Sequence, residues 1–286
     1  MKGVFLTIIA VLLFTGSSTL SAQKIVYVDK HFQWTTDKEK AVEYAVISKA
    51  KKKQTKVEFY TLDGRLKGIG HYSAYTKEPK NRVRNGVCTF LYANGKDSLV
   101  NIYKENRLEG QSIAYYPEGN TKLIITYKDG KMEGKLVEYY PDGKLRREES
   151  YLNDKCTDGK LLAADGNELS FEPYFVAPEF PGGIDALAKL LKDNLAYPLD
   201  AVRAKTEGKV ILRIVIDEKG HMTAPRLISG VDPLLDKEAM RIVEAIGRTH
   251  TWTPGKIDGE AKRISYTLPI NFHLPSLINW NLESGS

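Results

Sequence analysis

The last third of the chain has the most regular alternation of apolar and polar positions. Every second position between residues 209 and 216 is apolar, namely Val210, Leu212, Ile214 and Ile216. The positions between them are mixed, which predicts a β-strand with one face in a core and the other face partly exposed. Residues 217–220 predict a hairpin turn, and residues 221–229 predict a returning strand.

Two stretches with apolar residues three and four positions apart predict amphipathic helices. The first is residues 184–195, and a shorter helical segment over residues 199–205 follows it. The second is residues 233–247, where Asp232 is suited to cap the first turn and the proline after it is favoured at the first helical position. Gly247 is the predicted end of this helix.

Residues 263–272 alternate again, with Ile264, Tyr266 and Leu268 on one face. This pattern predicts a second half-buried strand. Pro269 has no amide hydrogen, so it belongs on an edge strand or at a bulge rather than in the middle of a sheet. The sequence therefore predicts that the last strand of the chain lies at a sheet edge.

Glycines and tyrosines recur every 24 residues in the middle of the chain. The period is marked by Gly95, Gly119 and Gly143, by Tyr92, Tyr116 and Tyr140, and by Tyr103, Tyr127 and Tyr151. Two short strands and two turns fill a period of this length. Residues 56–171 therefore predict an antiparallel meander of stacked hairpins, and residues 23–53 predict the start of the same sheet.

We interpret the recurring tyrosines as side chains that pack against the next hairpin. Aromatic cross-strand pairs stabilise a sheet that has an uncovered face. The alternative is an aromatic surface that binds a partner or a lipid.

The first residues of the chain read as an export signal. Lys2 is followed by an apolar run over residues 4–14, and Ser21 and Ala22 provide a small-residue cleavage site before Gln23. The run is shorter than the roughly 20 residues that a membrane span needs. We therefore expect a cleaved signal over residues 1–22, with an uncleaved membrane anchor as the alternative.

Charge adds little to this picture. The formal net charge is +6, and the dense basic run at residues 51–53 lacks interleaved aromatic residues. We therefore expect no nucleic-acid partner. The adjacent charges at residues 146–149 predict a solvated charged strand.

The residues that usually carry chemistry show no recognisable spacing. The five histidines lack metal-ligand spacing, and the chain contains no nucleophile elbow, P-loop or dinucleotide-binding glycine pattern. We therefore predict no enzyme activity and no cofactor or metal. Cys88 and Cys156 lie far apart in the sequence, so a disulfide in an oxidising compartment and two separate thiols both stay open.

The order of elements after residue 178 resembles the C-terminal domain of TonB-type proteins. The matching features are Tyr197-Pro198, Gly208, Asp217, Gly220, Leu235-Asp236, Ala239, Trp252, Pro254, Gly255 and Pro269-Ile270-Asn271-Phe272. The periodic region resembles degenerate bacterial MORN-type repeats, with a Tyr-x-x-Gly turn. Together these resemblances imply an α+β chain. An all-β antiparallel meander of MORN-like hairpins would precede two helices packed on a three-stranded antiparallel sheet.

The TonB resemblance also implies a binding site and a partner. In that family the final strand receives an extended segment of a partner, such as an outer-membrane receptor or another envelope protein. The residues expected to bind the partner strand are Arg263, Ile264, Ser265, Tyr266, Thr267, Leu268, Ile270, Asn271 and Phe272. The alternatives are that the chain's own tail covers this edge, or that a second copy covers it in a homodimer.

The predicted organisation has five parts: a signal at 1–22, a MORN-like domain at 23–171, a linker at 172–183, a TonB-like domain at 184–274 and a tail at 275–286. The resemblance and the signal together suggest a periplasmic protein-binding module linked to transmembrane transport. One alternative is an energy transducer held at the periplasmic side of the inner membrane by an uncleaved segment. The other is an envelope scaffold that acts through its repeats.

Overall fold

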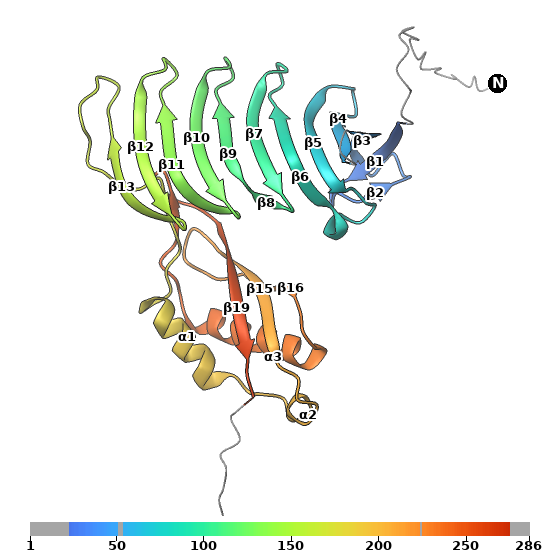
Figure 1. Cartoon of the computed structure of the whole chain (residues 1–286), viewed down its shortest axis with the longest axis vertical. Helices are drawn as coiled ribbons and strands as arrows, with labels where there is room; N and C mark the ends of the chain where they lie inside the picture. The colour runs from blue at the N-terminus through green and yellow to red at the C-terminus, as the bar shows by residue number, and fades with distance from the viewer. Residues whose placement is uncertain (1–22, 51–53, 224, 275–286) are drawn as a thin grey trace, which may run out of the picture. The chain divides into compact units, whose positions relative to one another are not determined.

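A computed structural model describes residues 23–50, 54–223 and 225–274. The chain divides into two compact units. The first contains the described residues up to 131 together with 141–143, and the second contains 132–140 and the described residues from 144 onward. Figure 1 shows the strands of both units and the helices of the second. The predicted signal and tail lie outside the described residues.

The first unit is a meander of antiparallel strands. Its elements are β1 (Lys24–Asp29), β2 (Trp34–Thr35), β3 (Ala41–Lys49), β4 (Thr55–Thr61), β5 (Leu66–Ala74), the 3₁₀-helix η2 (Pro79–Asn81), β6 (Val83–Leu91), β7 (Asp97–Lys104), β8 (Arg107–Leu108), β9 (Gly110–Tyr115) and β10 (Thr121–Lys128). The strand order is β10-β9-β7-β6-β5-β4-β3-β1-β2, and β8 pairs with β7. The prediction of stacked antiparallel hairpins is confirmed.

The 24-residue period corresponds to a repeated turn. The amide of Tyr92 donates to the carbonyl of Lys96 at 2.8 Å, and the amide of Gly95 donates back to Tyr92 at 3.0 Å. The turn at Tyr116 and Gly119 repeats both bonds, each at 2.8 Å. Gly119 has a φ of 100°, which glycine adopts without the steric cost of a Cβ. The sequence period is therefore set by hairpin turns.

The hydroxyls of two repeat tyrosines reach the following hairpin. Tyr92 Oη donates to the carbonyl of Tyr115 at 2.6 Å in the first unit. Tyr140 Oη donates to the carbonyl of Leu162 at 2.8 Å in the second unit. In the last turn Ala163 takes the tyrosine position, and its amide donates to Asn167. These contacts support the interpretation that the tyrosines hold successive hairpins together.

The second unit begins with the remaining strands of the repeat region. These are β11 (Lys131–Tyr139), β12 (Leu145–Leu152) and β13 (Lys155–Leu161), which pair antiparallel in the order β13-β12-β11. A small second sheet joins β14 (Phe175–Val176), β17 (Lys256–Ile257) and β18 (Glu260–Ala261). The segment predicted as a linker therefore contains β14, and its Phe180 is buried.

The rest of the second unit is two longer helices, a short one and a three-stranded sheet. The elements are α1 (Gly183–Asn194), α2 (Leu199–Arg203), β15 (Gly208–Ile216), β16 (Arg226–Ser229), α3 (Pro233–Thr249) and β19 (Ile264–Phe272). Leu187 of α1 and Ile242 of α3 share one apolar core with Leu212 of β15 and Phe272 of β19. The predicted packing of two helices on one face of a three-stranded antiparallel sheet is confirmed.

The start of α3 follows the prediction, and its end does not. Asp232 Oδ1 accepts from the amide of Leu234 at 2.8 Å, which confirms the predicted cap. The helix continues beyond Gly247 to Thr249, so the prediction that glycine ends it is wrong. A Cβ on Gly247 would meet the side chain of Met222, which indicates that glycine serves close packing at this position.

Candidate functional site

β19 lies at the edge of the C-terminal sheet. The strand order is β16-β15-β19, and the register of β19 on β15 runs without a shift from Gly208–Phe272 to Ile216–Ile264. Among the described residues no strand pairs with the other side of β19. The prediction that Pro269 marks an edge strand is confirmed.

The side chains of β19 alternate between the core and the open face of the sheet. Ile264, Leu268, Ile270 and Phe272 are buried, and Tyr266 is half-buried with its ring 5.8 Å from that of Trp252. The residues between them are exposed, namely Ser265, Thr267, Pro269 and Asn271. Arg263 precedes the strand and is also exposed. The nine residues predicted to bind a partner strand therefore fall into two sets with different surroundings.

The hydrogen bonds of β15 show which main-chain groups of β19 face outward. The carbonyl of Val215 accepts from the amide of Thr223 at 2.8 Å, and the amide of Asp217 donates to His221, both on the β16 side. Main-chain groups of an antiparallel strand alternate in direction. Even-numbered residues of β15 therefore face β19, and the register makes the even-numbered residues of β19 their partners.

The same alternation leaves the odd-numbered residues of β19 with outward main-chain groups. Ser265, Thr267 and Asn271 each direct an amide and a carbonyl away from β15. Pro269 directs only a carbonyl outward, because its ring nitrogen has no hydrogen. An incoming strand would thus meet three amide donors and four carbonyl acceptors.

β16 is the other edge of this sheet, a feature that the sequence interpretation did not include. Its four residues are exposed, and its ladder with β15 has a register shift between Ile211 and Leu212. Shifted ladders and short edges limit further pairing. β19 has nine residues in regular register, so it is the better of the two edges for strand addition.

A buried cluster of charged residues joins β12 to the C-terminal part of the second unit. The Arg147 and Glu149 side chains are 3% and 0% exposed and form an ion pair. Arg147 Nη2 also donates to Asp258 Oδ1 at 2.8 Å, and Nη1 donates to the carbonyl of Glu172 at 2.6 Å. The prediction of a solvated strand at residues 146–149 is therefore wrong for these two side chains.

The buried carboxylate of Glu149 accepts hydrogen bonds from Tyr174 and Tyr151 in addition to its ion pair with Arg147. The amide of Tyr174 donates to both carboxylate oxygens at 2.9 and 3.1 Å, and Tyr151 Oη donates to Oε2 at 2.6 Å. Burial raises the pKa of the Tyr151 hydroxyl, and the hydrogen bond to Glu149 raises it further. Tyr151 therefore stays a hydrogen-bond donor at neutral pH.

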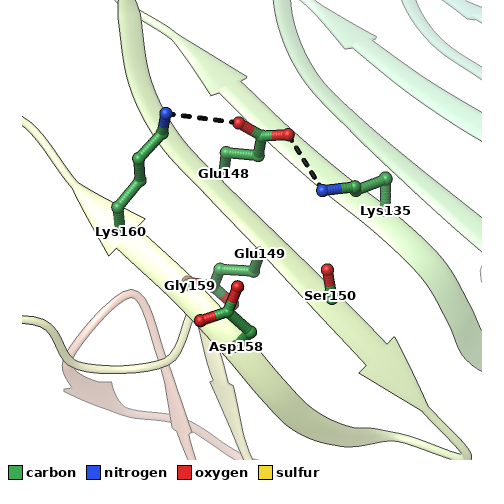
Figure 2. A pocket seen from close by; sticks show the side chains of 7 residues that line it. All are labelled: Lys135, Glu148, Glu149, Ser150, Asp158, Gly159 and Lys160. Carbon is green, nitrogen blue, oxygen red and sulfur yellow. Dashed lines mark hydrogen bonds and ion pairs between the residues drawn. The ribbon is translucent and has the colours of Figure 1, made fainter.

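The other face of β12 carries the solvated charges. Figure 2 shows Glu148 between Lys135 of β11 and Lys160 of β13, at 3.0 and 3.5 Å. The hydrogen bond from Lys135 is the main cause that lowers the pKa of the Glu148 carboxyl. These three residues belong to the lining of a shallow hollow, and each of them already takes part in an ion pair.

The described residues show no further arrangement that is typical of a chemical site. They contain no group of three or more histidine, cysteine, aspartate or glutamate residues that could hold a metal ion. Cys88 and Cys156 are both free thiols. Within the described ranges, no helix is both long enough and apolar enough to span a membrane.

Comparison with known proteins identifies two kinds of domain in the chain. Residues 193–274 match the family described as Gram-negative bacterial TonB protein C-terminal, and residues 108–129 and 132–153 each match the MORN repeat variant. A solution structure of the Helicobacter pylori TonB C-terminal domain is 17% identical with a TM-score of 0.26, and the match covers 31% of this chain and 78% of that one. No curated protein matches the chain.

The two family matches confirm both resemblances seen in the sequence. The matched segments stand in the order that the resemblances implied, with MORN-type repeats before a region similar to the TonB C-terminal domain. The TonB match supports a TonB-like protein-interaction module of the Gram-negative cell envelope.

Proposed function

We propose that the chain is an exported envelope protein that binds an extended segment of another protein by strand addition to β19. The partner is an outer-membrane receptor or another envelope protein, and the binding is linked to transmembrane transport. The observation that carries this proposal is the regular nine-residue edge of β19, which has no strand partner on its outer side among the described residues.

Strand addition explains how such an edge gives affinity. An incoming segment pairs with the outward groups of Ser265, Thr267 and Asn271, and each hydrogen bond contributes about 1 kcal/mol net. A segment of a few residues therefore binds at roughly micromolar strength unless its side chains add contacts. This range suits a partner that must be released after each encounter.

The location of the site follows from the predicted signal. Residues 1–22 lie outside the described residues, and export through this segment would place both units in the periplasm. There β19 would be accessible to the periplasmic side of outer-membrane proteins. Affinity capture from detergent-solubilised envelopes tests this proposal, and we expect the full chain to recover an outer-membrane receptor.

A proline variant shows whether capture depends on the edge. Thr267→Pro removes one outward amide at a position whose side chain is exposed, and Pro269 shows that the strand accepts proline on this side. We expect Thr267→Pro to weaken capture at least fivefold, because it removes about 1 kcal/mol and obstructs the edge. Thr267→Ala keeps the amide and is the matched control, so equal loss in both variants would contradict strand addition.

A further inference from the structure

The open face of the β16-β15-β19 sheet carries cations that have no acidic partner. Lys209 and Arg213 on β15 and Arg226 on β16 are exposed, and Arg263 lies directly before β19. Among the described residues, none of these four side chains takes part in an ion pair.

 The four side chains are therefore available to an anionic ligand.

Two of these cations lie directly opposite each other in the sheet. The register places Arg213 of β15 directly opposite Arg226 on one side and Thr267 of β19 on the other. Like charges directly opposite each other destabilise a sheet. Both arginines are exposed, so neither is held in place by the core.

Three acidic side chains near these cations in sequence, at residues 207, 217 and 260, already have partners. Asp217 accepts from the amides of Lys219 and His221 at 2.9 and 2.8 Å. Glu260 pairs with Lys262 at 2.6 Å, and Glu207 accepts from the amide of Leu274 at 2.5 Å. None of these three carboxylates forms an ion pair with a cation of the open face.

The exposed side chains of β19 are short, which leaves the space above that strand open. A strand added to β19 would lie about 10 Å from β15, or two strand spacings. The long side chain of Arg213 can reach over Thr267 toward a carboxylate on the added strand. Lys209, which lies opposite Asn271, can do the same farther along.

We infer that the segment bound at β19 is acidic, with carboxylates at alternate positions that face Arg213 and Lys209. This inference rests on the proposed strand addition and names the chemistry of its ligand. An anionic membrane surface would also attract these cations, but it offers no main chain to pair with the outward amides of β19. An acidic peptide can pair with the outward amides of β19 and also place carboxylates near the cations.

Binding of synthetic peptides to the full chain tests this inference. The probes are fluorescein-labelled, valine-rich peptides of eight residues with two glutamates, two glutamines or two lysines at alternate positions. Fluorescence anisotropy should show that the glutamate peptide binds on the order of tenfold more tightly than the lysine peptide at low salt. The preference should shrink as salt is added, because exposed charges are screened.

Two variants with the same change in net charge separate a local subsite from a general attraction. We expect Arg213→Glu to abolish or reverse the preference for the glutamate peptide, whereas Lys219→Glu, in the turn after β15, should leave it within about twofold. The Arg213→Glu chain is expected to fold, because it replaces a like-charge pair with an attractive one.

The possible failures are distinguishable. Binding of all three peptides with equal affinity would overturn the inference and leave strand addition standing. Binding of none would overturn both. Flotation of the full chain with phosphatidylglycerol vesicles, lost in Arg213→Glu, together with no peptide preference, would assign the cations to a membrane surface instead.

Discussion

Arg213 and Arg226 form a cross-strand pair of like charges, which we expect to lower stability. They lie opposite each other on an exposed face, without an acidic partner among the described residues. We predict that Arg226→Glu raises the free energy of unfolding by about 0.5 kcal/mol, because it turns a repulsive pair into an attractive one. Urea denaturation measures this change. Arg226→Gln should give a smaller gain, and a loss of stability in Arg226→Glu would contradict the assignment.

Glu148 and Glu149 are neighbours in sequence with opposite surroundings. Glu149→Ala would remove one buried partner of Arg147 and would leave the Tyr174 amide and the Tyr151 hydroxyl without their acceptor. We therefore predict a loss of about 3 kcal/mol in the free energy of unfolding. Glu148→Ala on the solvated face is the matched control, and we expect it to change stability by less than about 1 kcal/mol. Equal effects in urea denaturation would contradict the burial of the pair.

The sequence could not distinguish these two glutamates. Alternation predicts that they point to opposite faces, but charged residues at all four positions from 146 to 149 give no apolar contrast to show which face is covered. The cover comes from Glu172 and Tyr174, some 25 residues later in the chain. By contrast, Pro269 has no amide hydrogen to donate to a neighbouring strand, so the edge strand could be predicted from the sequence.

At the scale of elements, the turn between β15 and β16 is fixed by a close backbone approach. Gly220 has a φ of 84°, and a Cβ there would collide with the carbonyl oxygen of Trp252. We predict that Gly220→Ala lowers the free energy of unfolding by roughly 2 kcal/mol or more.

Gly143 offers a matched control for that prediction. It has nearly the same φ, 85°, but no atom lies within 4 Å of an added Cβ. Gly143→Ala should therefore cost only about 1 kcal/mol, the price of the backbone conformation alone. If both variants lose the same stability in thermal denaturation, the contact with Trp252 is not what fixes the turn.

Regular elements with a clear apolar stripe were the most predictable part of the fold. The core strands and both longer helices follow their periodic patterns, and Asp232 caps α3 as its residue type indicates. The end of α3 was not predictable, because Gly247 makes room for the side chain of Met222 and does not end the helix. Such tertiary contacts are not visible in the local sequence.

At the scale of the whole molecule, cleavage of the predicted signal at residues 1–22 would decide where the proposed binding takes place. A cleaved signal would release the chain into the periplasm, whereas an uncleaved segment would anchor it to the inner membrane. We predict that N-terminal sequencing of the chain purified from envelopes yields Gln23 as the first residue. A mature chain that begins at Met1 or Lys2 would favour the anchored energy transducer.

The central claim is that β19 has outward amides free for a partner, and amide hydrogen exchange of the full chain tests it most directly. We predict that the amides of Thr267 and Asn271 exchange rapidly in the free protein, that the Leu268 amide is protected by β15, and that a captured partner segment protects all three. Protection of Thr267 and Asn271 in the free protein would contradict the claim, because the edge would then already be covered.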